Sequence, residues 1–144
     1  MARVDITHRF HLRVIYAQTD RMNIVYYSRY YEFFEAARTA LLRKIEVSYA
    51  GLEREGYRLP VVESHCRYHG SATFEDLLTI ETYLEEEPKA KLKLAYKVFK
   101  AGREEPIVTG YTIHSFVNSD LRPVRAPQQF NECLRRHAGQ VLED

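Results

Sequence analysis

The segment YAQTDRMNIVYYSRYYEFFEAAR, Tyr16–Arg38, decides the fold because it joins a polar loop to the most apolar helix of the chain. Ser28 is a common helix-capping residue type, and the pattern after it predicts a helix from about Arg29 to Lys44. The apolar face of this helix is broad and comprises Tyr30, Phe33, Phe34, Ala37, Ala40 and Leu41. A face this wide must be covered by other elements. One acid, Asp20, stands on the loop before the helix.

Period-two alternation predicts strands on both sides of the helix. The run from Ile6 to Tyr16 alternates through Phe10, Leu12, Val14 and Tyr16. Four strand-like runs follow the helix: Pro60–Tyr68, Leu77–Glu85, Lys91–Phe99 and Ile107–Val117. Turn residues separate them at His69-Gly70-Ser71, Glu87-Pro88 and Ala101-Gly102. Such short connectors favour antiparallel neighbours.

Two shorter helices complete the predicted elements. Ser48–Glu55 begins with a capping residue and is followed by Gly56, a residue type that suits the position after a helix end. Gln128–His137 resembles a terminal helix with Phe130, Cys133 and Leu134 inward. One long helix and about five strands predict an α+β fold, with a five-stranded antiparallel sheet wrapped around one central helix in a single domain, residues 1–144.

Composition excludes several classes of protein. A chain of 144 residues that is 45% hydrophobic suits one domain, and its net charge of +1 lacks the basic field that nonspecific nucleic-acid binding requires. Cys66 and Cys133 stand in no CxxC pair, so neither a disulfide framework nor a structural zinc site is expected. No apolar run approaches the roughly 20 residues of a membrane span. We therefore expect a cytoplasmic protein without a nucleic-acid or membrane partner.

Three ordered segments carry a resemblance to a known family. The first combines Tyr16–Asp20, Ile24–Tyr27 and Tyr30–Arg38; the others are YHGSATFEDLLTIET, Tyr68–Thr82, and GYTIHSFVNSDLRPVRAP, Gly110–Pro127. Together they resemble the hotdog-fold acyl-CoA thioesterases of the 4-hydroxybenzoyl-CoA thioesterase family. The resemblance implies a hotdog fold and hydrolysis of acyl-CoA to a free acid and CoA, with no metal and no cofactor.

The resemblance also implies the site residues. The family's catalytic acid falls on Asp20, and the backbone N–H that holds the thioester carbonyl falls at or near Tyr27. A helix N-terminus has unpaired N–H groups and a partial positive charge, so it can stabilise the oxyanion that forms when the carbonyl is attacked. Asp20 can act as the nucleophile or as a general base toward water, and the sequence leaves both routes open.

The chain departs from the family pattern beside this site. Many members have Gly where this chain has Asn23, although Asn also reaches positive φ. Many have His-Ala-Asn or His-Val-Asn where this chain has Tyr27-Ser28-Arg29, which weakens any acid/base role of the side chain at position 27. Arg29 in place of this Asn would put a cation where it could meet the phosphates of CoA. The predicted substrate-binding cations are Arg29, Arg67, Lys91, Arg122 and Arg125.

Other polar residues fit structural roles. Glu35 and Arg38 are three residues apart on the helix and suit a surface or subunit-contact pair. His65 and His69 would lie about 13 Å apart along a strand, too far to share one zinc ion. Cys66 points to the opposite face from His65, which favours a structural cysteine over a nucleophile.

The resemblance implies monomers that pair through their sheets and share active sites, as a homodimer or homotetramer. An exposed sheet edge independently favours pairing. Two alternatives stay open: a thioesterase acting on acyl carrier protein, and a noncatalytic hotdog protein that binds acyl or aromatic ligands. Asp20 argues against the second, because an apolar binder has no use for an uncompensated carboxylate near its ligand. The sequence does not identify the acyl group.

Overall fold

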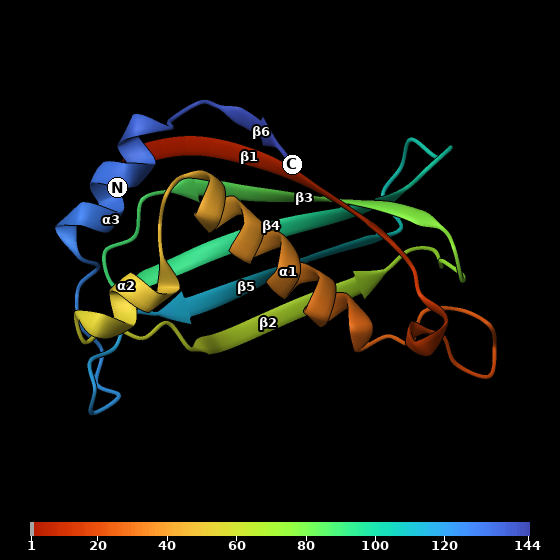
Figure 1. Cartoon of the computed structure of the whole chain (residues 1–144), viewed down its shortest axis with the longest axis horizontal. Helices are drawn as coiled ribbons and strands as arrows, with labels where there is room; N and C mark the ends of the chain where they lie inside the picture. The colour runs from red at the N-terminus through yellow and green to blue at the C-terminus, as the bar shows by residue number, and fades with distance from the viewer. Residues whose placement is uncertain (1) are drawn as a thin grey trace.

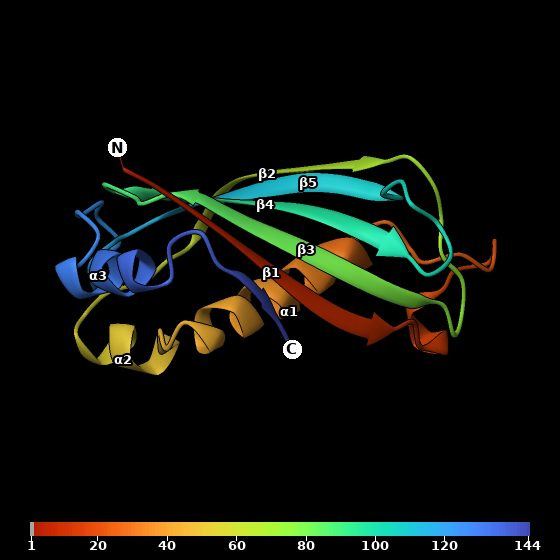
Figure 2. The same ribbon diagram turned by 90° about the horizontal axis from the view of Figure 1, so that it is seen from above.

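Helix α1 (Arg29–Lys44) lies across one face of a curved six-stranded sheet (Figures 1 and 2). The structure is a computed structural model that describes residues 2–144, so Met1 of the predicted domain lies outside the described residues. The strands are β1 (Arg3–Arg13), β2 (Val61–Tyr68), β3 (Leu77–Glu86), β4 (Lys91–Lys100), β5 (Val108–Ser115) and β6 (Val141–Glu143). The remaining helices are α2 (Tyr49–Arg54), α3 (Gln128–Arg136) and the short 3-10 helix η1 (Tyr16–Gln18).

The predicted bounds and apolar face of the central helix are confirmed. All six predicted apolar residues of α1 are buried, together with Leu42. Phe34 stacks on Tyr96 of β4, with ring centroids 4.2 Å apart. Gly110 of β5 makes this close packing possible, since a Cβ there would lie 2.4 Å from the carbonyl oxygen of His65 and 3.0 Å from the Phe34 ring. The core therefore lies between α1 and the concave face of the sheet.

The sheet is larger than predicted, and it is not purely antiparallel. Its strand order is β2-β5-β4-β3-β1-β6, and β6 pairs with β1 in parallel. The first five strands pair antiparallel, as expected. The prediction of five strands is wrong because Val141–Glu143 is too short to show a period-two pattern. This sixth strand forms only after α3 returns the chain to β1.

The first strand and the start of α1 also differ from prediction. β1 ends at Arg13, and Tyr16 is 74% exposed within η1 instead of ending the strand. The side chain of Gln18 accepts a hydrogen bond from Ile15 N–H at 2.9 Å, which turns the chain out of the sheet. Ser28 occupies the cap position of α1, but its backbone is already helical and its side chain makes no capping bond.

The shorter helices follow the sequence closely. The Ser48 hydroxyl caps α2 by accepting a hydrogen bond from Gly51 N–H at 3.0 Å, and Gly56 has a φ of +87° just beyond the helix end. Phe130 and Leu134 of α3 are buried, whereas Cys133 is only half-buried. Among residues 2–144, no helix has both the length and the apolar character needed to cross a bilayer.

Candidate active site

A tight loop between η1 and α1 holds Asp20. Thr19 pairs with Val25 as an isolated bridge, and Asp20 N–H donates to the carbonyl of Ile24 at 2.9 Å. Asn23 closes the loop with a φ of +64°, the positive φ that Asn can reach where many family members have Gly. Its carbonyl accepts a 2.6 Å hydrogen bond from the Thr73 hydroxyl. The loop is therefore fixed by its own backbone and by the segment before β3.

The carboxylate of Asp20 is half-buried and partly engaged. Its Oδ1 accepts a hydrogen bond from Met22 N–H at 2.8 Å, and its Oδ2 has no hydrogen-bond partner among residues 2–144. The pKa of Tyr26 is raised, first by a hydrogen bond and charge interaction with Tyr27 and also by the negative charge of Asp20. Asp20 therefore lies close to the aromatic segment that leads into α1, with one oxygen available for chemistry.

The start of α1 presents unpaired backbone donors. Arg29 N–H bonds to the carbonyl of Tyr26 at 2.9 Å, which makes the turn before the helix. Within the described residues, the N–H groups of Tyr27 and Ser28 have no hydrogen-bond acceptor. Two free N–H groups at the positive end of a 16-residue helix are suited to an oxyanion or another anionic group. The resemblance to hotdog thioesterases implied a donor at this position.

Tyr68, the last residue of β2, fixes the backbone at Tyr27. Its hydroxyl donates to the carbonyl oxygen of Tyr27 at 3.0 Å, and its ring packs against Tyr30 with centroids 5.6 Å apart. Burial and a hydrogen bond with Cys66 raise the pKa of Tyr68, so its hydroxyl stays protonated and keeps donating. The sequence did not single out Tyr68 for this role, because the contact joins positions 41 residues apart.

The predicted substrate-binding cations are spread over the molecule. Arg29 lies beside the helix start and binds Glu32 at 3.0 Å and the Ala17 carbonyl at 3.4 Å. Arg67 lies on β2 between Cys66 and Tyr68, which face α1, so alternation directs it to the opposite face of the sheet. Of these five cations, Arg29 is the one that bonds to the segment just before Asp20, through the Ala17 carbonyl.

The other three cations lie at the far end of the sheet. Lys91 begins β4, and Arg122 and Arg125 belong to the segment that joins β5 to α3, at the end of the molecule that carries α2 (Figure 1). Arg125 shares a surface hollow with Glu87 and Lys89. One chain therefore does not bring Lys91, Arg122 and Arg125 to the Asp20 loop.

A buried polar network lies beneath α1, and sequence reasoning missed it. Arg38 is only 12% exposed, and its nearest carboxylate is that of the 73%-exposed Glu35 at 3.7 Å. The predicted Glu35–Arg38 pair is thus present, but its cation points inward. Burial, and then the charge of Arg38, lower the pKa of His114 to about 4. The neutral ring of His114 bonds to Thr112, which bonds to the Tyr96 hydroxyl at 2.7 Å.

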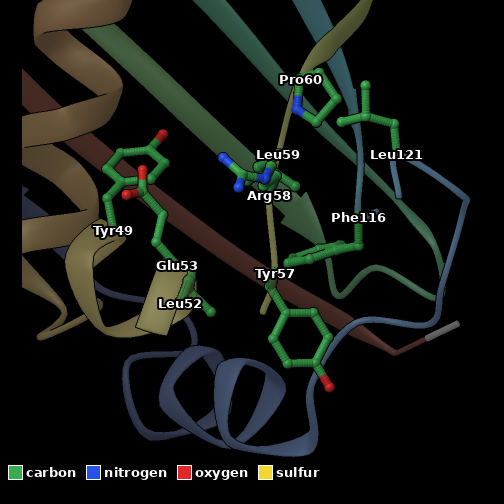
Figure 3. A pocket seen from close by; sticks show the side chains of 9 residues that line it. All are labelled: Tyr49, Leu52, Glu53, Tyr57, Arg58, Leu59, Pro60, Phe116 and Leu121. Atoms are coloured by element: carbon green, nitrogen blue, oxygen red, sulfur yellow. The ribbon is translucent and has the colours of Figure 1, made fainter. Parts of the chain in front are cut away.

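A cavity of about 310 Å³ lies at the α2 end, opposite the Asp20 loop (Figures 1 and 3). We call it the α2 cavity; its lining consists of Tyr49, Leu52, Glu53, Tyr57, Arg58, Leu59, Pro60, Phe116 and Leu121. The lining is mostly apolar. Figure 3 shows the Arg58 side chain pointing toward Tyr49 and Glu53, so the charged groups gather on one side. Burial raises the pKa of Tyr49, and the charge of Arg38 opposes this rise. Arg38 is therefore close to Tyr49, so the buried network borders the α2 cavity at this residue.

Comparisons with known proteins agree with this architecture. The profile of the Thioesterase-like superfamily matches residues 14–134. A 1,4-dihydroxy-2-naphthoyl-CoA hydrolase of Picosynechococcus is 31% identical over 111 residues, covering 74% of this chain and 76% of the relative. The acyl-CoA thioesterase YbgC of Haemophilus influenzae is 37% identical over 84 residues, covering 58% of this chain and 62% of the relative.

Solved structures give the same result. The DHNA-CoA thioesterase from Staphylococcus aureus superposes with a TM-score of 0.84 at 25% identity, covering 91% of this chain and 90% of that one. A 4-hydroxybenzoyl CoA thioesterase complexed with 4-hydroxybenzoyl CoA has a TM-score of 0.81 at 20% identity, covering 89% and 98%. The second likeness is one of fold alone. The predicted hotdog architecture and family resemblance are confirmed.

Proposed function

Because the chain belongs to the Thioesterase-like superfamily, we propose that it hydrolyses acyl-CoA thioesters at Asp20 and the start of α1. The observation that carries this proposal is the unbonded N–H of Tyr27, next to a fixed loop whose acid has one free oxygen. A donor and a carboxylate in this arrangement suit attack on a carbonyl carbon. The named relatives that act on CoA thioesters support the substrate class.

The reaction has two balanced routes. In the first, a carboxylate oxygen of Asp20 bonds to the thioester carbon, CoA leaves as its thiolate, and water then hydrolyses the mixed anhydride. In the second, Asp20 takes a proton from water as the water oxygen attacks the carbon, and the thiolate leaves and is protonated. In both routes the Tyr27 N–H donates to the carbonyl oxygen as negative charge develops on it.

The proposal also requires that two copies of the chain pair through β2, the strand at one edge of the sheet. In a single chain β2 has exposed residues at every position except half-buried Cys66, and it carries the exposed side chains of Val61, Val62 and Tyr68. An open, partly apolar edge strand of eight residues suits pairing with the same strand of a second copy. We therefore extend the proposal to a homodimer or homotetramer.

The dimer also gives a role to the distant cations. Arg122, Arg125 and Lys91 lie at the α2 end of one chain, and antiparallel pairing of β2 would bring that end toward the Asp20 loop of the partner. There they would join Arg29 in binding the phosphates of CoA. Arg67 lies on the opposite face of β2, so it would bind a phosphate only if the nucleotide part of CoA lies along that face of the sheet.

A substrate screen tests the proposed activity. Release of free thiol is measured in steady state over short, long and aromatic acyl-CoAs, and again with an acyl-loaded carrier protein. We expect turnover of at least one class of acyl-CoA, with a higher kcat/KM than for the carrier-protein substrate. A preference for the carrier protein would transfer the assignment to that substrate class. No turnover of any thioester would remove the enzymatic assignment.

A pair of variants separates the Tyr27 backbone from its side chain. Tyr27→Phe keeps the N–H, so we expect less than about a tenfold change in kcat. Tyr27→Pro deletes the N–H just before the helix, and we expect kcat to fall by about 10² to 10³. Circular dichroism checks that both variants fold. If the folded Pro variant stays active while the Phe variant is crippled, the phenol and not the N–H is the working group.

A further inference from the structure

We propose that the hydroxyl of Tyr68 is a positioning group for catalysis, because it aims the N–H of Ser28 at the substrate as a second oxyanion donor beside that of Tyr27. The inference rests on the proposed thioesterase function. It deepens that function, since it assigns two backbone donors to the thioester carbonyl and makes one of them depend on a side chain of strand β2.

Peptide geometry sets the direction of both N–H groups. In a trans peptide the N–H points opposite to the carbonyl, and the described chain has no cis peptide bond. The Tyr26 carbonyl turns toward the helix, where it accepts from Arg29 N–H, so the N–H of Tyr27 points away from the helix. The Tyr27 carbonyl likewise accepts from Tyr30 N–H, so the N–H of Ser28 points the same way. Two neighbouring donors thus point outward at the positive end of α1.

The backbone holds these two peptides unequally. The Arg29 N–H bonds to the Tyr26 carbonyl at 2.9 Å, a normal length. The Tyr30 N–H approaches the Tyr27 carbonyl at 3.4 Å, which is long for such a bond. The Tyr68 hydroxyl supplies the shorter bond to this second carbonyl, at 3.0 Å, and it must be the donor because a carbonyl oxygen can only accept. The orientation of the second peptide, and of its N–H, therefore depends on Tyr68.

The Tyr68 side chain is suited to this task. Its ring packs edge-on against Tyr27, with centroids 6.4 Å apart, and against Tyr30, with centroids 5.6 Å apart. Burial, followed by a hydrogen bond with Cys66, raises the pKa of the hydroxyl, so it remains a donor at neutral pH. A bond accepted by the carbonyl also polarises its peptide, which strengthens the N–H on the other side as a donor. Loss of the hydroxyl should therefore weaken stabilisation of the oxyanion and leave the catalytic acid in place.

Tyr68→Phe tests the hydroxyl, because it keeps the ring and its packing. We expect kcat toward the best acyl-CoA to fall by about tenfold with KM within about twofold of the parent, since the donor acts chiefly as the oxyanion forms. Tyr83→Phe is the matched control: it removes a hydroxyl that bonds to Glu81 on the opposite face of the sheet, and it should match the parent. A rise in KM alone, or no change in kcat, would overturn the inference.

The carbonyl frequency of bound substrate is a readout that a purely structural role would not move. An acyl-CoA with an isotope-labelled thioester carbonyl is bound to Asp20→Asn, which slows turnover, and its infrared difference spectrum is recorded. Hydrogen-bond donors lower this frequency, so adding Tyr68→Phe should shift the band to higher wavenumber. Adding Tyr83→Phe should leave the band in place. An unmoved band in the Tyr68 variant would show that its hydroxyl does not act on the carbonyl.

A double variant shows whether Tyr68 acts through Ser28. Ser28→Pro deletes the N–H, and the φ of −72° at this position already suits proline. We expect kcat to fall by about 10² to 10³. Adding Tyr68→Phe to Ser28→Pro should then cost nothing further, because the hydroxyl has no N–H left to position. A second loss of about tenfold would show that the hydroxyl acts elsewhere. The infrared experiment decides the inference if the proline variant does not fold.

The outcomes separate this inference from the proposed function. If the parent hydrolyses acyl-CoA and Tyr68→Phe is equally active with an unmoved carbonyl band, Tyr68 is structural and only the inference is wrong. If the parent itself hydrolyses no thioester, the proposed function fails and the inference fails with it.

Discussion

The two edges of the sheet are closed in different ways. At the β1 edge, β6 pairs in parallel through Thr7–Val141, and the terminal Asp144 binds buried His8 at 2.9 Å. At the β2 edge, the described chain places no strand beyond β2, and Val61 and Val62 are 47% and 53% exposed. The chain thus covers one edge with its own C-terminal segment and leaves the other open.

The difference shows where a second copy is needed. The three residues of β6 cover Thr7–Arg9 of β1, whereas in the described chain no strand pairs with the outer side of the eight-residue β2. The open edge also borders the proposed site, because Tyr68 on β2 donates a hydrogen bond to the carbonyl of Tyr27. We infer that dimerisation and catalysis depend on the same strand, and that the closed edge affects stability alone.

Charging the open edge should have the largest effect. We expect the double variant Val61→Lys, Val62→Lys to sediment at the monomer mass of 17.0 kDa, because two added charges per chain oppose strand pairing. Turnover should fall by about 100-fold, since the site loses the partner's contribution. Val141→Lys charges a valine that is 61% exposed on the closed edge, and it should keep both the oligomer and the activity. A fully active monomer of the double variant would contradict the shared-site account.

Acid should weaken the side of the core next to the open edge. The pKa of His114 is lowered to about 4, so the unfolded chain binds a proton there more readily than the folded chain does. The stability contributed by neutral His114 is present above about pH 6.5 and is lost as the pH falls toward 4, by up to about 3 kcal/mol.

Urea unfolding at pH 7.5 and pH 5, at one protein concentration, measures this loss. The difference between the two pH values should shrink in His114→Asn and persist in His137→Asn, the matched control at a half-buried histidine after α3. An equal pH dependence in the parent and His114→Asn would show that another group is responsible.

Sequence reasoning succeeded where the determinants are local. The apolar periodicity of α1, the cap at Ser48 and the positive φ at Asn23 depend on neighbouring residues, and the structure has all three. The buried network of Arg38 and His114 could not be predicted, because it joins residues 76 positions apart whose contact is made only by folding. The α2 cavity has the same origin, since Leu52 and Phe116 come together across the chain. The position of Arg38 in the middle of α1, among apolar residues, was the one signal that could have drawn attention to the network.

Disrupting the closed edge should have the smallest effect. Asp144→Ala removes the carboxylate that binds the fully buried His8 ring, whose Nδ1 already lacks a partner among the described residues. We expect the free energy of unfolding to fall by about 1 kcal/mol, the usual scale for a hydrogen bond to a partly exposed group. Mass and turnover should stay within twofold of the parent. A loss of activity without a loss of stability would show that this edge also serves the active site.

Turnover of an acyl-CoA by Asp20→Asn tests the central claim most directly. The substitution keeps the size of the side chain and its acceptor oxygen for Met22 N–H, while removing the charge that attacks the carbonyl or accepts a proton. We expect kcat to fall by about 100-fold or more with the fold and substrate binding retained. Glu132→Gln, which neutralises an exposed acid on α3, should match the parent. Turnover of Asp20→Asn within threefold of the parent would remove Asp20 from the mechanism.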